Sequence, residues 1–151
     1  MSAPAEFDLE SFLPYRLNKA AEAASHAFQE VYRDRYGMTR TEWRVLAHLG
    51  QYGEMTARDI CERAALHKTK VSRAVFALEK RRWLARRADE RDRRVEHLVL
   101  TDKGKELFRN LGQAAQALDA EFKARLGDEA HARLLKLLDD VSAPDTSPNR
   151  P

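Results

Sequence analysis

The 151-residue chain contains one cysteine and no long apolar run. Cys61 has no second thiol to pair with, so an internal disulfide is excluded and a reducing compartment fits. No stretch approaches the ~18 apolar residues that a membrane span requires. The N-terminus also lacks the basic and apolar segments of a secretory signal. We therefore expect a soluble, cytoplasmic protein without a membrane partner.

Motifs of catalysis and metal binding are also missing from the sequence. There is no G-x-S-x-G, no H-E-x-x-H and no glycine-rich loop that could hold a phosphate. The histidines are scattered without the spacing of metal ligands: His26, His48, His67, His97 and His131. We therefore expect neither an enzyme nor a protein that carries a metal or another cofactor.

Basic residues concentrate in one short part of the chain. Residues 67–94 contain eleven Lys and Arg against four Asp and Glu, an excess of seven positive charges. The flanks 1–66 and 95–151 each contain eight against ten. A basic block between two slightly acidic flanks indicates a polyanion as the partner. The alternative is a charged face that contacts only water.

Apolar residues recur at helical spacing near both ends of the chain. The N-terminal stripe predicts a helix that begins close to Pro14, which is tolerated only in the first turn, and ends at Gly37. The C-terminal stripes predict a long helix that Thr101 caps and Gly127 ends, and a last helix over 129–141. These stripes are more apolar than so small a protein can cover, so we infer that they pack against a second copy.

Between these stripes the sequence predicts three short helices and a hairpin. Thr39 with Glu42, and Thr56 with Asp59, have the spacing of residues that cap a helix start. The predicted elements are a helix from Thr39 to between Gly50 and Gly53, helices over 57–64 and 68–82, and strands over 83–87 and 95–100. Three helices followed by a two-stranded wing predict a winged helix-turn-helix in a mainly α-helical fold.

This pattern divides the chain into five predicted segments. They are a frayed N-terminus (1–10), an N-terminal dimerisation helix (11–36), a winged helix-turn-helix DNA-binding domain (39–100), C-terminal dimerisation helices (101–142) and a tail (143–151). The expected partners are therefore double-stranded DNA and a second copy of the chain.

The helix-turn-helix proper is predicted over 60–73. The second helix of such a motif lies in the major groove with its N-terminal side chains at base edges. Lys70 and Arg73 suit guanine, while Thr69 and Ser72 suit a base edge or a phosphate. The candidate DNA-binding side chains of this helix are His67, Lys68, Thr69, Lys70, Ser72 and Arg73. For each of them, a phosphate contact without a base contact is the alternative.

Two segments carry a resemblance to a known family. They are the charged hairpin tip 89–94, Asp-Glu-Arg-Asp-Arg-Arg, and the helix start 100–104, Leu-Thr-Asp-Lys-Gly. They resemble the wing signature of the MarR family of bacterial transcriptional regulators, D-x-R-D-x-R followed by L-T-x-x-G, with every signature position present. The resemblance extends over about 13–141 and implies a winged helix-turn-helix that regulates transcription.

The tip of the predicted wing carries three arginines. An arginine at a hairpin tip can enter the minor groove, where narrow A·T-rich stretches concentrate negative potential. We assign Arg91 and Arg93 to this role and count Arg94 as a further DNA-binding candidate. We expect Asp92 with Arg94 to fix the wing. The alternative is an exposed hairpin held by salt bridges.

Two positions of the predicted helix-turn-helix depart from common patterns. Glycine is more frequent in the turn than Ala65, because a left-handed backbone costs other residues more. His67 stands where the family usually has Asp or Ser, and histidine is a poorer helix cap. Thr69 or water would then compensate, or the imidazole would contact a phosphate. Steeply crossing helices also need a small residue at their contact, and Cys61 or Ala64 could fill that place.

The family resemblance also implies a dimer and a ligand. The first helix and the last two would form a triangular two-fold dimer, so that two recognition helices enter successive major grooves, about 34–36 Å apart, on a pseudo-palindromic operator. Such a protein would associate with the nucleoid when bound to DNA, with a strongly salt-dependent affinity. We expect a repressor that a small aromatic or phenolic molecule releases from DNA.

Relatives commonly bind such an effector between the dimer helices and the DNA-binding head. An arginine can pair with a carboxylate, and aromatic side chains suit a ring. The candidate effector-binding residues are Tyr15, Asn18 and His26 on the first helix, with Trp43, Arg44 and His48 on the second. A core role for Trp43 and a surface or interface role for His26 are the alternatives.

Three other functions stay open at this point. A sequence-indifferent architectural DNA-binding protein would need the same basic block without a preference for a palindrome. A redox-responsive regulator would act through Cys61, although the reactive cysteine of such relatives lies near the start of the first helix. A protein-interaction module would leave the basic helix and the wing without a purpose.

Overall fold

The structure, a computed structural model, describes residues 6–144. Its α-helices are α1 (Leu13–Gln29), α2 (Arg40–Tyr52), α3 (Ala57–Ala64), α4 (Lys68–Lys80), α5 (Asp102–Leu126) and α6 (Asp128–Ser142). One compact unit extends to Ala114 and a second begins at Ala115, so the boundary falls inside α5. Across the described residues, no helix is both long enough and apolar enough to span a bilayer.

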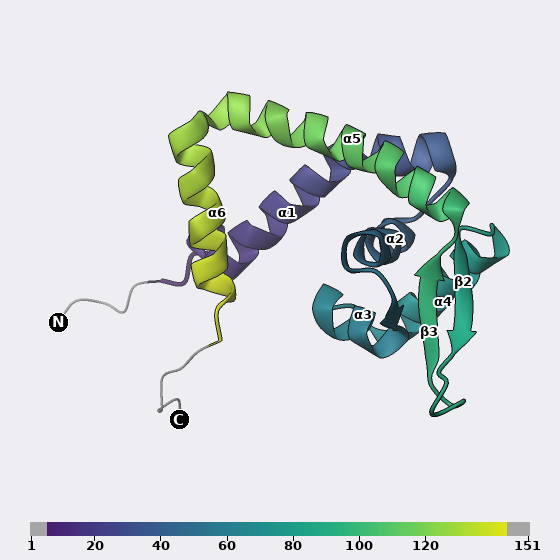
Figure 1. Ribbon diagram of the computed structural model, residues 1–151. Coiled ribbons are helices and arrows are strands. Elements are labelled where there is room, and N and C mark those ends of the chain that lie inside the picture. The colour runs from purple at the N-terminus through teal and green to yellow at the C-terminus, as the bar shows by residue number, and fades with distance from the viewer. Residues whose placement is uncertain (1–5, 145–151) are drawn as a thin grey trace. The chain divides into compact units, whose positions relative to one another are not determined.

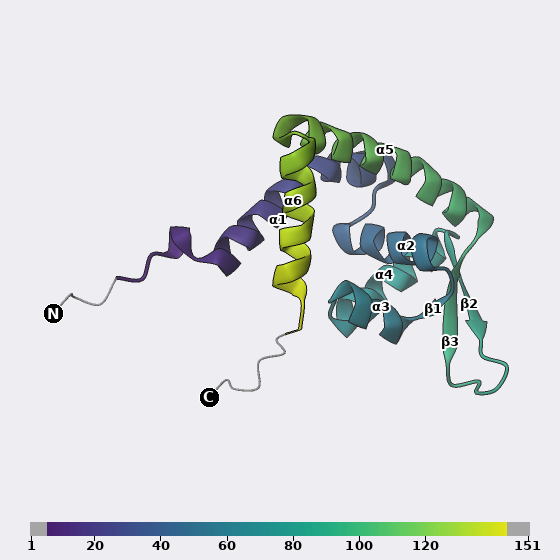
Figure 2. The same ribbon diagram turned by 60° about the vertical axis from the view of Figure 1, so that its left-hand side comes forward.

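The fold is mainly α-helical with a small antiparallel sheet, in the arrangement of a winged helix-turn-helix. Helices α2, α3 and α4 lie beside the sheet, and the β2–β3 hairpin projects beyond them as the wing (Figures 1 and 2). The strands are β1 (Met55–Thr56), β2 (Leu84–Ala88) and β3 (Glu96–Leu100), in the order β1-β3-β2. The sequence pattern missed β1, whose two residues are too short to show alternation.

The first helix begins as predicted, with Pro14 in its first turn. Its α-helical part ends at Gln29, however, and a π-helical segment, η2 (Glu30–Asp34), continues it toward Gly37. Gly37 has φ +63° and ends the helix, as expected. A short 3-10 helix, η1 (Leu9–Ser11), precedes α1 and was not predicted from the sequence. Residues 1–5 of the predicted frayed terminus, and 145–151 of the predicted tail, lie outside the described residues.

Both predicted capping boxes are present. The Thr39 hydroxyl accepts a hydrogen bond from the backbone N–H of Glu42, whose carboxylate accepts one from the N–H of Thr39, both at 3.2 Å. Thr56 and Asp59 do the same at 3.1 and 3.0 Å. Each box satisfies two backbone donors that have no partner inside the helix, and this fixes where α2 and α3 begin.

The hydrophobic core of the winged part lies where helices α2, α3 and α4 meet the sheet. Buried side chains include Val45, Leu46 and Leu49 of α2, Ile60 and Ala64 of α3, Val71, Ala74, Val75 and Leu78 of α4, and Leu84, Leu98 and Leu100 of the sheet. Of the two small residues that could lie at the contact between α3 and α4, Ala64 is buried and Cys61 is half-buried. Ala65 adopts the expected left-handed backbone, with φ 50° and ψ 48°.

The start of α5 is tied to the turn before β2. The Thr101 hydroxyl donates to the carbonyl of Arg82 at 2.7 Å and accepts from the N–H of Gly104 at 3.1 Å, so it caps α5 as expected. Gly104 is buried against the carbonyl of Trp83, where a Cβ atom would have no space. The threonine and glycine of the L-T-x-x-G pattern thus join the wing to the long helix.

Candidate nucleic-acid interface

The side chains that the sequence analysis named as DNA-binding candidates on helix α4 are all exposed. Its buried face contains Val71, Val75 and Leu78. The predicted DNA-binding residues are all exposed: His67, Lys68, Thr69, Lys70, Ser72 and Arg73. They occupy the first two turns of α4 and the residue that caps it, so the helix presents donors at the end from which recognition helices contact bases.

His67 itself caps α4, which differs from the expectation that another group must compensate. Its Nδ1 accepts a hydrogen bond from the backbone N–H of Thr69 at 3.3 Å. An imidazole nitrogen without a proton can accept in the same way as a carboxylate oxygen. Since Nδ1 is occupied by the helix end, only Nε2 of this ring is left for a DNA contact.

The wing tip is shaped by Asp89 and Asp92. Asp89 Oδ1 accepts hydrogen bonds from the backbone N–H groups of Arg91 at 2.8 Å and Asp92 at 3.0 Å. Asp92 Oδ1 accepts from the N–H of Arg94 at 3.0 Å. The expected pair of Asp92 with Arg94 therefore acts through the backbone and not through the guanidinium. Both aspartates hold the turn and leave the arginine side chains free to point outward.

Four polar side chains form a cluster near the tip end of the hairpin, and we call them the wing latch: Glu54, Arg87, Asp89 and His97. Arg87 Nη2 lies 2.5 and 2.6 Å from the two carboxylate oxygens of Glu54. His97 lies between the two acids, with Nε2 2.7 Å from Asp89 Oδ2 and Nδ1 3.3 Å from Glu54 Oε1. The latch connects the loop before β1 to both strands of the hairpin. Sequence reasoning missed it.

The contacts within the wing latch lower the pKa of its two carboxyl groups. Hydrogen bonds from the His97 ring and from the backbone N–H groups of Asp92 and Arg91 lower the pKa of Asp89 from 3.8 to about 2. The hydrogen bond from Arg87 also lowers the pKa of Glu54. Both shifts favour the ionised form, so the wing geometry depends on charged carboxylates.

Acid should therefore weaken the fold through Asp89. Because its folded pKa lies below 3.8, its stabilising contribution is complete above pH 3.8 and is lost as the pH falls toward about 2. We expect the melting temperature of the wild type to fall more steeply between pH 4 and pH 2 than that of Asp89→Asn. Glu90→Gln, which removes the adjacent carboxylate, is the matched control. Parallel melting curves for wild type and Asp89→Asn would contradict the assignment.

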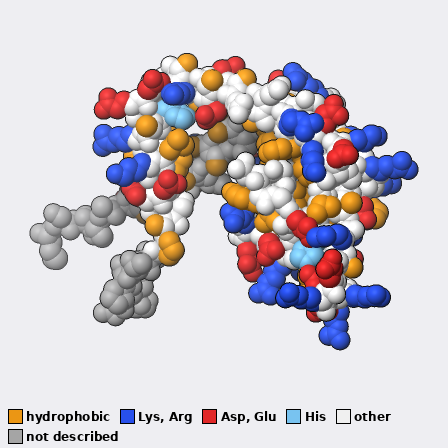
Figure 3. Space-filling view, viewed as in Figure 1, with side chains coloured by type: hydrophobic (Ala, Val, Ile, Leu, Met, Phe, Trp, Pro, Cys, Tyr) orange, Lys and Arg blue, Asp and Glu red, His pale blue; other side chains and the backbone are white. Residues whose placement is uncertain are grey.

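The basic block divides into paired and unpaired side chains. Arg86 is neutralised by Glu79 at 2.8 Å and Glu96 at 2.9 Å, as Arg87 is by Glu54. Among residues 6–144, no ion pair engages the cations of α4 and the wing tip, which are Lys68, Lys70, Arg73, Lys80, Arg91, Arg93 and Arg94. Basic side chains spread outward from the wing tip in Figure 3. Unpaired cations on two projecting elements suit a polyanion.

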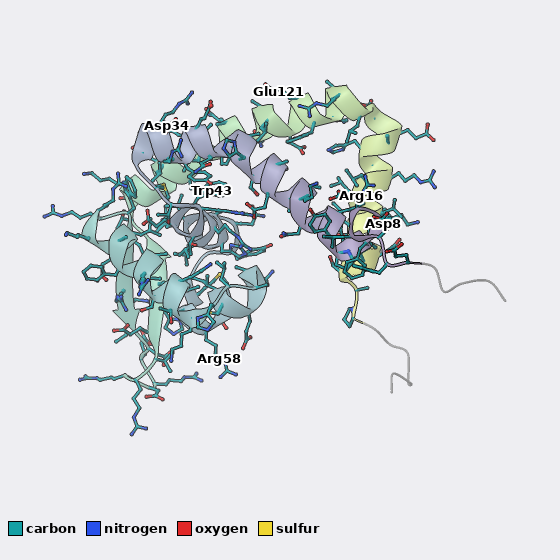
Figure 4. All side chains as sticks on the ribbon, turned by 180° about the vertical axis from the view of Figure 1, so that it is seen from behind. Asp8, Arg16, Asp34, Trp43, Arg58 and Glu121 are labelled. Atoms are coloured by element: carbon teal, nitrogen blue, oxygen red, sulfur yellow. The ribbon has the colours of Figure 1, made fainter. Side chains whose placement is uncertain are left out.

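A pocket of about 420 Å³ lies between α1 with η2 and the start of α2. It is lined by Ala24, Ser25, Phe28, Tyr32, Arg40, Trp43 and Arg44. Trp43, labelled in Figure 4, packs against Phe28 with the rings tilted and their centroids 5.1 Å apart, and it is half-buried. Burial lowers the pKa of Arg44, whose guanidinium donates to the carbonyl of Ala64.

Only Trp43 and Arg44 of the six effector candidates line this pocket. The other four lie elsewhere: Tyr15, Asn18, His26 and His48. Tyr15 packs under Lys19 near the start of α1, and His48 Nδ1 is held by the carbonyl of Arg44 at 2.6 Å. The sequence analysis did not name Phe28, Tyr32 or Arg40 for this role.

Cys61 lines a different pocket, of about 470 Å³, formed by α3, α4 and β2. Its lining includes Lys68 and Ser72 of α4 and Arg86 of the sheet. The thiol is half-buried, and the chain contains no second cysteine. This environment gives no specific support to redox sensing.

Comparison with known proteins finds similar transcriptional regulators. The model of the MarR family matches residues 36–95. The repressor MdtR of Bacillus subtilis is 30% identical over 96 residues, which are 64% of this chain and 62% of MdtR. The repressor MprA of Escherichia coli K12 is 37% identical over 82 residues, 49% of this chain and 46% of MprA. The match thus spans less than two thirds of MdtR and less than half of MprA.

A solved structure extends the likeness to the rest of the fold. The MarR family regulator SPO1453 of Silicibacter pomeroyi DSS-3 superposes with a TM-score of 0.78 and 28% identity, over 91% of this chain and 100% of that one. The matched segment 36–95 contains the winged helix-turn-helix up to the wing tip. Residues 36–95 of this chain thus match the MarR family, and the fold as a whole resembles that of a MarR family regulator.

Proposed function

We propose that this protein is a sequence-specific, dimeric DNA-binding repressor of transcription. One observation carries the proposal: within residues 6–144 no ion pair engages the cations on the exposed face of α4 or at the wing tip, while Arg86 and Arg87 of β2 are paired with carboxylates. In this arrangement α4 enters the major groove and the wing tip reaches the adjacent minor groove. MdtR and MprA are repressors, which favours repression, and no catalysis is expected.

The dimer would be formed by the terminal helices. None of the described side chains of α6 is buried in the single chain, although the helix is amphipathic. Its apolar residues are 38–52% exposed: Leu134, Leu135, Leu137, Leu138 and Val141. Phe12 and Leu13 at the start of α1 are also about half exposed. Clusters of exposed apolar residues in a soluble protein mark interaction sites, and a second copy of the chain supplies an identical apolar face.

The effector would be a small aromatic carboxylate in the pocket between α1 and α2. Trp43 and Phe28 supply aromatic walls and Arg44 supplies positive charge, whereas the guanidinium of Arg40 is already paired with Glu22 at 2.7 Å. The pocket joins the N-terminal helix to the first helix of the DNA-binding part. A ligand held there would favour one spacing of the two α4 helices over another, and would lower the DNA affinity if the favoured spacing did not match the grooves.

A binding experiment separates this proposal from architectural DNA binding. Duplexes are selected from a random library with the full-length protein, and affinities for the selected and shuffled duplexes are compared at several salt concentrations. We expect a palindromic site, a protein dimer by sedimentation, and preference for that site by a factor of at least about 10³. Equal affinity for both duplexes would favour the architectural alternative. Repeating the titration with benzoate tests the effector, which should weaken the complex.

A further inference from the structure

An exposed aromatic ring stands on the recognition helix. The side chain of Phe76 is 64% exposed, in the middle of a surface whose other side chains are polar or cationic. The other exposed large apolar residues of the winged part are less conspicuous. Tyr52 lies under the guanidinium of Arg63 at 3.9 Å, and Val95 is 37% exposed. The ring of Phe76 is therefore not part of the hydrophobic core of the described residues.

Phe76 lies on the face of α4 that points away from the core. Positions 69, 73, 76 and 80 follow one another at intervals of four, three and four residues, which places them on one stripe of an α-helix. We call Thr69, Arg73, Phe76 and Lys80 the outer stripe, and all four are exposed. The buried residues Val71, Val75 and Leu78 lie on the opposite side.

Phe76 lies close to the two residues of the outer stripe that are expected to contact bases. At a rise of 1.5 Å per residue, Phe76 lies about 4.5 Å from Arg73 and about 10 Å from Thr69 along the helix axis. The major groove admits an α-helix, and Phe76 shares a stripe with Thr69 and Arg73, so a helix that contacts bases through those two residues also turns Phe76 toward the bases. Arg73 and Lys80, on either side of Phe76, supply the charge that draws this face to a duplex.

We propose that Phe76 recognises thymine through its 5-methyl group, one or two base pairs from the base that Arg73 contacts. The inference rests on the proposed function and assigns a specificity-determining residue to it. The thymine methyl is the apolar group that the bases present in the major groove, and phenylalanine is among the side chains that contact it. Covering the ring with this methyl removes apolar surface of both partners from water.

Replacing single thymines by deoxyuridine tests the proposal, because this change removes the methyl and keeps the base pair. Sites selected by the wild-type protein are scanned at every thymine, and affinities of wild type and Phe76→Ala are measured for each duplex. We expect one thymine in each half-site at which deoxyuridine weakens wild-type binding. The affinity should fall about fourfold for each half-site that is changed, as for the loss of one buried methyl group. Phe76→Ala should show no penalty at that position, and Phe76→Leu should restore part of it.

The controls keep the inference separate from the proposed function. Tyr52→Ala removes another exposed ring of the winged part and should keep the wild-type deoxyuridine profile. If the wild type selects a site but no deoxyuridine penalty depends on Phe76, the inference is wrong and the repressor function stands. If Phe76→Ala changes only sedimentation, the ring contacts protein and the inference is also wrong. A wild type that selects no site overturns the proposed function itself.

Discussion

Gly104→Ala is expected to lower the free energy of unfolding by about 3 kcal/mol or more, the upper range for an overpacked core. A Cβ atom at this position would lie 2.0 Å from the carbonyl oxygen of Trp83 and 3.3 Å from the Cβ of Leu100. The Trp83 oxygen already accepts a hydrogen bond from the N–H of Thr101 at 3.1 Å. Because the contacted atom belongs to the backbone, no side-chain rotation relieves the clash. Chemical denaturation followed by circular dichroism measures the loss.

Gly112→Ala is the matched control in the same helix. No heavy atom lies within 4 Å of a Cβ atom built at Gly112. Alanine is favoured over glycine inside a helix by up to about 1 kcal/mol, so this variant should be as stable as the wild type or more so. Similar small effects at both positions would show that α5 does not approach the Trp83 carbonyl as closely as the structure places it.

Local signals in the sequence predicted most helix boundaries of the winged part. The capping boxes at Thr39 and Thr56 are confirmed, since each depends on residues three apart whose bonds form within one turn. The left-handed turn at Ala65 is confirmed for the same reason, because its geometry is set by neighbouring residues. Amphipathic spacing then placed the buried face of α4 correctly.

Features that depend on distant residues were not predicted. The wing latch joins Glu54 to Arg87, which are 33 residues apart. This contact exists because β1 pairs with β3 in the register that sets Thr56 opposite His97. A two-residue strand has no periodicity to detect, so neither the register nor the latch could be inferred. The signature motif pointed to Asp89 without revealing that its partner is His97.

The effector candidates show a related limit. Helical spacing placed Tyr15, Asn18 and His26 on the first helix, but it did not indicate which part of that helix faces α2. In the structure Phe28 and Tyr32 face it, close to the π-helical segment that widens the helix there. Residue chemistry alone favoured polar and aromatic side chains anywhere on the first helix, whereas only the last turns of α1 and η2 face α2 across the pocket.

Arg73→Ala and Arg91→Ala are expected to weaken DNA binding in two different ways. Loss of a bidentate contact to guanine costs about 1–3 kcal/mol at the selected site, and loss of Arg73 should leave binding to shuffled DNA nearly unchanged. Loss of Arg91 at the wing tip should weaken binding to both duplexes by a similar factor, because the charge acts through the groove potential and the phosphates. Fluorescence anisotropy with both duplexes measures each ratio.

The salt dependence gives an independent readout of the same two roles. Removing one phosphate-neutralising charge should reduce the slope of log affinity against log salt by about one. We expect this change for Arg91→Ala with either duplex and a smaller change for Arg73→Ala. Arg58→Ala is the matched control, since Arg58 (Figure 4) is an exposed α3 arginine paired with Glu62 at 3.0 Å. If Arg58→Ala reduced the affinity as much as Arg91→Ala, the wing tip would have no special role, and general positive charge would explain DNA binding.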